Sequence, residues 1–190
     1  MASNFATKLA RTAVEQRELY HFYTENDEPL RGQIRHYWED IGFNFPGVGE
    51  AWSAVFVSWN VSQAGATAQE FLFNPQHSQY VWRCIKNATD GIGVFRGLPI
   101  TEHGPQVGDI IQANRGGSSH NYQYATTHRS YASHCAIVTE SGEDESGPYA
   151  LTIGGNESDS VGRKIVRLTS DGLIRQRDTN PYMCVIQNLK

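Results

Sequence analysis

The first half of the chain places apolar residues at the spacing of amphipathic helices. From residue 4 to about residue 23 they recur every three or four positions, and the same spacing returns in residues 30–41 and 73–87. Such periodicity is typical of helices that bury one face and expose the other. The pattern therefore predicts three helices that pack one side on a common core.

A fourth segment, residues 50–65, is apolar on nearly every side. Residues 55–57 alone could form a strand, but the length of the segment and Gly65 at its end favour a buried central helix. On this interpretation Ser53 lies in the first turn, where backbone N–H groups lack helical partners and the helix dipole is positive. That position suits a nucleophile or a developing anion.

The second half of the chain changes to short apolar runs separated by turns rich in Gly, Ser and Asp. These runs predict strands over residues 109–113, 134–140, 149–154, 164–169 and 182–187. Because helices come first and strands follow, we expect an α+β domain whose antiparallel sheet is covered on one side by helices. The length of 190 residues suits one domain, helical over about 1–98 and β-rich over about 106–190.

A long polar connection, residues 114–133, separates the first two of these strands and carries several histidines and tyrosines. Connections of this length inside a domain are usually functional or mobile, and both interpretations remain open here. If the segment faces a substrate, Arg115, Tyr122 and Tyr124 are candidate binding residues, together with Trp52 beside Ser53.

Charge and cysteine content narrow the functional classes. The 16 Lys and Arg against 20 Asp and Glu give a net charge of −4, which disfavours binding to nucleic acid. No apolar run approaches the roughly 20 residues that span a bilayer. The three cysteines lack a CxxC pair and the histidines lack metal-ligand spacing, so we expect neither a metal nor another cofactor.

Three residues could form a hydrolytic site. Ser53 would be a nucleophile at a helix start, His134 a base at the beginning of a strand, and Asn156 the residue that orients the histidine from the next strand. Cys135 cannot replace Ser53 if His134 faces the site, because adjacent strand residues point to opposite faces. The alternatives are a plain helix cap for Ser53, a core histidine for His134 and a turn residue for Asn156.

Four short motifs carry a resemblance to a known group of enzymes. Trp52-Ser-Ala-Val-Phe-Val-Ser-Trp59, Gly108-Asp-Ile-Ile111, His134-Cys-Ala-Ile-Val138 and Gly154-Gly-Asn156 resemble, in order and strand context, the motifs of CHAP-type peptidoglycan amidases and peptidases. This papain-like group has Cys where this chain has Ser53. The likeness covers about residues 46–169 and implies a papain-like fold, with peptidoglycan or its stem peptide as the partner.

The chain more closely resembles an uncharacterised bacterial and phage domain family within that group, whose members read Trp-Ser-Ala. The shared residues include Tyr37-Trp38, His77-x-x-Tyr80, His134-Cys135 and Gly154-Gly-Asn156. From their helical spacing, His77 and Tyr80 are expected to serve packing and hydrogen bonding.

The serine raises a chemical requirement. A hydroxyl depends on full general-base assistance, and an amide in third place offers no negative charge to the imidazolium. A Ser-His-Asn set therefore calls for a nearby carboxylate, for which Glu50 and Asp159 are candidates.

Two hypotheses follow from this requirement. The first is a peptidoglycan-directed amidase or peptidase, and the second is a catalytically silent papain-like module that binds cell wall or forms part of a phage or secretion particle. No secretory leader is visible. We therefore expect the bacterial cytoplasm before release, or the periplasm, cell wall or virion as the site of action, unless a leader has been removed. The oligomeric state stays open.

Overall fold

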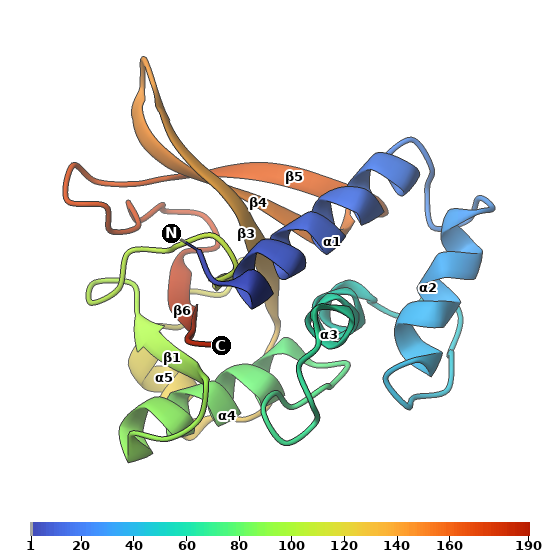
Figure 1. Ribbon diagram of the computed structural model, residues 1–190, viewed down its shortest axis with the longest axis horizontal. Helices are drawn as coiled ribbons and strands as arrows, with labels where there is room; N and C mark the ends of the chain where they lie inside the picture. Colours follow the sequence, from blue (N-terminus) through green and yellow to red (C-terminus); the bar gives the residue numbers. More distant parts are fainter. Residues whose placement is uncertain (1) are drawn as a thin grey trace.

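A six-stranded antiparallel sheet and five helices make up the computed structural model, which describes residues 2–190 (Figure 1). The strand order is β1-β6-β2-β3-β4-β5. Helices lead the chain and most strands follow, so the predicted α+β class is confirmed. The helices are α1 (Asn4–Tyr20), α2 (Leu30–Glu39), α3 (Ser53–Ala64), α4 (His77–Asp90) and α5 (Tyr122–Thr127). The strands are β1 (Phe95–Pro99), β2 (Ile110–Asn114), β3 (Ser133–Asp144), β4 (Gly147–Glu157), β5 (Ser160–Arg167) and β6 (Tyr182–Asn188).

Two short elements were not predicted from the sequence. Strand β1 pairs with β6 at one edge of the sheet, and its central Gly97 lets the backbone approach Ile85 of α4. Helix α5 lies inside the long polar connection, where the side chain of Asn121 caps it by accepting from the N–H of Tyr124. Both elements are too short to show a clear apolar period.

Helix α3 is the centre of the packing, as its apolar sequence predicts. Nine of its twelve residues are buried, and Gly65 ends it in the left-handed conformation with φ 107°. Figure 1 shows α3 between α1, α2 and α4, and it contacts α1, α2, β3 and β4. Ser53 is its first residue, so the predicted place of this serine at the start of a buried helix is confirmed.

Two clusters of buried side chains lie on the two faces of the sheet. The larger one, the helix-side core, joins α1, α3 and α4 to residues such as Cys135 and Ile137 of β3. The smaller one joins Val138 of β3 to Leu168 and Ile174, which lie in the segment between β5 and β6. Cys135 is fully buried while its neighbour His134 is partly exposed, which confirms that the cysteine faces the core.

Gly155 sets the close approach of β4 to α3. A Cβ atom at this position would lie 2.6 Å from Cβ of Phe56 and 2.6 Å from Cζ3 of Trp52. Both partners are fully buried and cannot move without disturbing the helix-side core. The glycine is therefore required by packing.

We predict that Gly155→Ala lowers the free energy of unfolding by ~1–3 kcal/mol, the usual cost of overpacking. Urea unfolding followed by tryptophan fluorescence measures the change. Gly49→Ala is the matched control, because no atom lies within 4 Å of a Cβ there. A loss in Gly155→Ala no larger than that in Gly49→Ala would contradict the packing argument.

Candidate functional site

Ser53 at the start of α3 meets a histidine at the start of α4. The Oγ atom of Ser53 lies 2.7 Å from Nε2 of His77, in a hydrogen bond between two buried side chains. Each residue opens its helix, so the packing of two helix N-termini brings the hydroxyl and the imidazole together. The partner of Ser53 in the structure is thus a histidine from α4.

The hydrogen-bond network around His77 orients its ring. Nδ1 of His77 is hydrogen-bonded to the hydroxyl of Tyr80, one turn further along α4, so both ring nitrogens of His77 have a partner. In the tautomer in which Nδ1 donates to Tyr80, the lone pair of Nε2 accepts from the hydroxyl of Ser53. The two hydrogen bonds together fix the plane of the ring.

Burial keeps this network uncharged. Desolvation lowers the pKa of His77 well below its usual value, and the nearby His134 and Arg115 lower it further. Burial also raises the pKa of the Cys135 thiol to about 12, in spite of the hydrogen bond from Tyr80. His77 is neutral at pH 7, and Cys135 is a protonated thiol that cannot act as a nucleophile.

The second histidine, His134 near the start of β3, is paired with a carboxylate. Its Nε2 atom lies 3.0 Å from Oε1 of Glu157, the last residue of β4, and the other oxygen of Glu157 lies 3.0 Å from Nζ of Lys164. The rings of His134 and His77 meet edge to face, with 5.6 Å between their centroids. A continuous polar chain therefore runs from Ser53 through both histidines to Glu157.

Glycines make room for the Glu157 side chain. Gly154 of β4 and Gly162 of β5 are paired across the sheet, and a Cβ on either would come within 2.6 Å of Glu157 atoms. Burial of the Glu157 carboxyl raises its pKa, but the hydrogen bond and charge of His134, followed by Lys164, outweigh burial, and the net pKa is lowered. The carboxylate is charged and is held against His134.

Asn156 has a different partner from the one predicted. Its Nδ2 atom donates to Oε2 of Glu25 at 3.1 Å, and Nε1 of Trp52 donates to the same oxygen at 2.8 Å. The positive φ of 55° at Asn156 turns its side chain away from the histidine and leaves that position to Glu157. Asn156 therefore ties β4 to the segment after α1, and the orienting group of His134 is its neighbour.

The two other carboxylates considered from the sequence, Glu50 and Asp159, stay outside the site. Both are exposed, and within residues 2–190 neither side chain makes a hydrogen bond or ion pair. Asp159 lies in the turn between β4 and β5 with φ 60°, where its carbonyl accepts from the N–H of Glu25. The requirement for a carboxylate is met by Glu157 in place of either.

Three of the four residues proposed to bind substrate serve the fold. Trp52 is fully buried and stacks on Tyr37 with 6.0 Å between ring centroids. The hydroxyl of Tyr122 donates to the carbonyl of Gly97 and so attaches α5 to β1, and burial raises its pKa to about 12. Tyr124 is stacked between His120 and His128 at 3.8 and 3.7 Å. Trp52 therefore offers no surface to a substrate, whereas Tyr122 and Tyr124 are partly exposed and their contact with a substrate stays a prediction.

Arg115, the fourth candidate, borders two cavities at the site. The first, which we call the serine cleft, has a volume of about 470 Å³ and is lined by Ser53, His77, Arg115 and Tyr131 among others. The second, the basic cleft, has about 170 Å³ and is lined by Arg115, His134, Glu157, Lys164, Arg177 and Asn180 among others. The two histidines therefore open into different cavities that share Arg115.

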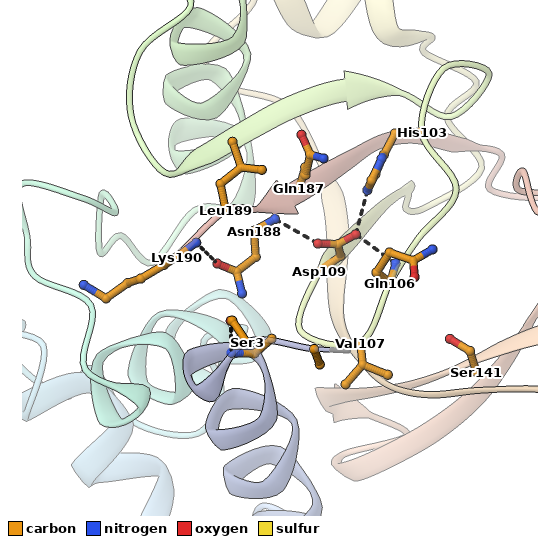
Figure 2. A pocket seen from close by; sticks show the side chains of 12 residues that line it. Ser3, His103, Gln106, Val107, Asp109, Ser141, Gln187, Asn188, Leu189 and Lys190 are labelled. Carbon is orange, nitrogen blue, oxygen red and sulfur yellow. Dashed lines mark hydrogen bonds and ion pairs between the residues drawn. The ribbon is translucent and has the colours of Figure 1, made fainter.

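A further cavity of about 540 Å³ lies between the start of α1 and the end of β6 (Figure 2). Its buried carboxylate, Asp109, accepts from Nε2 of His103 and from the backbone N–H groups of Gln106 and Asn188, each within 2.9 Å. Gly108 beside it packs against Ala6 of α1. The Gly108-Asp109 motif therefore joins three chain segments and has a structural explanation.

Two general properties concern the whole described chain. Within residues 2–190, no three His, Cys, Asp or Glu side chains come together in a way that could hold a metal ion. Over the same part of the chain, no helix combines the length and the apolar character needed to cross a membrane.

Sequence reasoning missed two residues of the site. The signal for His77 was its three-residue spacing from Tyr80, which correctly placed both on one helix face but did not show that Ser53 would lie above them. Glu157 gave a weaker signal, because it follows Asn156 directly and only the turn at φ 55° decides which of the two faces His134. The places of His77 and Glu157 in the site are therefore set by contacts between different elements of the fold.

The buried state of His77 predicts a pH-dependent stability. The pKa of His77 is lower in the folded protein than in the unfolded chain. Below about pH 6.5, His77 is therefore protonated in the unfolded chain while it stays neutral in the folded protein. We expect the free energy of unfolding to fall on acidification by up to about 1 kcal/mol per pH unit from this group. Urea unfolding between pH 8 and 5 should show a smaller slope of the free energy of unfolding against pH for His77→Gln than for wild type.

His36→Gln is the control, because it removes an exposed histidine and should keep the wild-type slope. Equal slopes in all three proteins would contradict the assignment to His77.

Comparison with known proteins gives a family and no closer relative. No curated protein and no solved structure matches the chain. A family described as "Uncharacterized protein conserved in bacteria (DUF2272)" matches residues 33–185, which include Ser53, His77, His134 and Glu157. With most of its length inside the match, the chain belongs to this bacterial family.

Proposed function

We propose that the protein is an amide hydrolase directed at the peptide part of bacterial peptidoglycan, with Ser53 as nucleophile and His134 as base. The observation that carries the proposal is the His134–Glu157 pair beside the Ser53–His77 hydrogen bond at the N-terminus of α3. This arrangement supplies the carboxylate that a serine site needs and that an asparagine would lack.

Charge compensation selects His134 as the base. The proton that leaves Ser53 creates an imidazolium, which is stable only where a negative charge or solvent offsets it. His77 is fully desolvated and its other partner is a neutral tyrosine. His134 has the carboxylate of Glu157 at 3.0 Å and is partly exposed. The proton is therefore more stable on His134 than on His77.

His77 acts as a positioning residue for the nucleophile. Its hydrogen bond fixes the Ser53 hydroxyl at the wall of the serine cleft, and the ring itself is fixed by Tyr80. The edge-to-face contact of the two imidazoles, with 5.6 Å between their centroids, brings His134 against the histidine that holds this hydroxyl. The proposed reaction requires that Ser53 leave His77 and pass its proton to Nδ1 of His134, a nitrogen that has no hydrogen-bond partner among residues 2–190.

The first turn of α3 offers donors for the developing oxyanion. The first backbone hydrogen bond of the helix runs from the N–H of Phe56 to the carbonyl of Trp52, and no side chain caps the preceding groups. The N–H groups of Ser53 and Ala54 therefore remain available next to the nucleophile. Donors at a helix N-terminus stabilise the negative charge of a tetrahedral intermediate.

The choice of substrate and the papain-like relationship rest on the motif series. A nucleophile at a helix start, a histidine near the start of a strand and a polar residue at the end of the next strand are the order of the CHAP-type enzymes. Ser53, His134 and Glu157 occupy those places in α3, β3 and β4. This correspondence supports cell-wall peptide as the substrate and the periplasm, cell wall or virion as the place of action.

A second candidate is a silent module that binds cell-wall peptide without cleaving it. The burial of Ser53 favours it, because only 1% of the residue is exposed and its hydroxyl is engaged by the neutral His77. A serine that keeps this partner would hold the two helices together and perform no chemistry. The serine cleft would then serve as a binding groove.

We predict that the wild-type protein releases soluble peptides from purified peptidoglycan and that Ser53→Ala abolishes the release. The expected loss is about a thousandfold or more, since the nucleophile is removed. Glu157→Gln should lower kcat by up to about ten-thousandfold, because the amide leaves the imidazolium uncompensated. Mass spectrometry of the soluble fraction measures the products and identifies the bond.

Glu143→Gln is the matched control, because it makes the same chemical change at an exposed position on β3 and should leave the rate unchanged. Product release by Ser53→Ala at the wild-type rate would exclude the serine mechanism. Inactivity of the wild type combined with binding to peptidoglycan would instead favour the silent module.

A further inference from the structure

The basic cleft concentrates positive charge in an acidic protein. Arg115, Lys164 and Arg177 line it, and Glu157 is the carboxylate in the described lining. The chain as a whole has a net charge of −4, so this cluster of three cations is a local feature. Because Glu157 is already paired with His134 and Lys164, the cleft keeps an excess of positive charge.

Arg115 contributes a cation without an internal partner. Its side chain is exposed, and among residues 2–190 it forms no ion pair and no side-chain hydrogen bond. It also lines the serine cleft next to Ser53 and His77. A ligand group held by Arg115 would therefore lie close to the proposed nucleophile.

Arg177 is held in place by the protein, which reduces the entropy that it loses on binding. Its Nε donates to the carbonyl of Asn180 at 2.9 Å, and the guanidinium lies 4.3 Å above the ring of Tyr182. The hydrogen bond uses one edge of the guanidinium, and its terminal nitrogens remain for another acceptor. A fixed planar guanidinium of this kind suits the two oxygens of a carboxylate.

We infer that the basic cleft binds a free carboxylate of the substrate, held by Arg115 and Arg177 with support from Lys164. This inference rests on the proposed function and adds to it a substrate class, peptides that carry an ionised carboxylate near the scissile amide. The ligand runs from the serine cleft past Arg115 into the basic cleft. The small volume of about 170 Å³ fits one such group.

A matched pair of synthetic peptides tests the inference. Both are acetyl-L-Ala-γ-D-Glu-L-Lys-D-Ala with the C-terminus blocked as an amide, one with the α-carboxyl group of its glutamate free and the other with the same group as a carboxamide. Isothermal titration calorimetry on Ser53→Ala measures their affinities without hydrolysis. We expect the free carboxylate to bind about tenfold more tightly, as is usual for a charge-assisted contact. Added salt should reduce the difference.

Arg115→Gln in the same background should lower the preference to about twofold or less. Arg163→Gln should preserve the tenfold preference, because this arginine is the neighbour of Lys164 on β5 but lines a different cavity with Val14 and Glu18. Equal affinity for the two peptides, no binding of either, or an unchanged preference in Arg115→Gln would overturn the inference. Tighter binding of inorganic phosphate than of the carboxylate peptide would also overturn it.

Hydrolysis of the same peptides by the wild type separates this inference from the proposed function. A charge preference in binding without hydrolysis keeps the carboxylate site and removes the hydrolase. Hydrolysis of both peptides without any preference in binding keeps the hydrolase and removes the carboxylate site.

Discussion

The buried carboxylate of Glu157 is the interaction on which the site depends. A charged group at this depth is costly unless partners compensate it, and here His134 and Lys164 do so on its two oxygens. Because the carboxylate fixes the Nε2 side of the His134 ring, it also determines that Nδ1 is the free nitrogen. The orientation of the His134 ring therefore follows from where one carboxylate can be accommodated.

The Gly154-Gly155 pair reconciles this carboxylate with the packing of α3. Successive residues of a strand face opposite sides of the sheet. The missing side chain of Gly154 leaves room for Glu157 and His134, while the missing side chain of Gly155 lets Phe56 and Trp52 of α3 touch the strand. Two adjacent glycines thus bring the helix that begins with Ser53 and the strand that ends with Glu157 close together.

What could be predicted from the sequence follows from how local each signal is. The buried helix of Ser53 and the inward direction of Cys135 depend on periodicity within one element, and both were predicted correctly. The contact of Ser53 with His77 depends on how two helices cross, which no single segment encodes. The choice of Glu157 over Asn156 depends on a residue with positive φ at the end of a strand, and two neighbouring polar residues give the same sequence signal. Trp52 was predicted to bind substrate because it lies next to Ser53. In the structure its large side chain is fully buried and packs in the core around α3.

The polar chain of the site changes in charge from the core to the surface. His77 and Tyr80 at the inner end are desolvated, and their pKa values favour the neutral forms. His134 in the middle shares a carboxylate, and Arg115, Lys164 and Arg177 at the outer end are exposed. A positive charge next to Ser53 is therefore stabilised only in the outward direction, and an anion is attracted from the same side. In the proposed mechanism this gradient makes His77 a positioning residue for Ser53 and leaves charge separation to His134 and the cations beyond it.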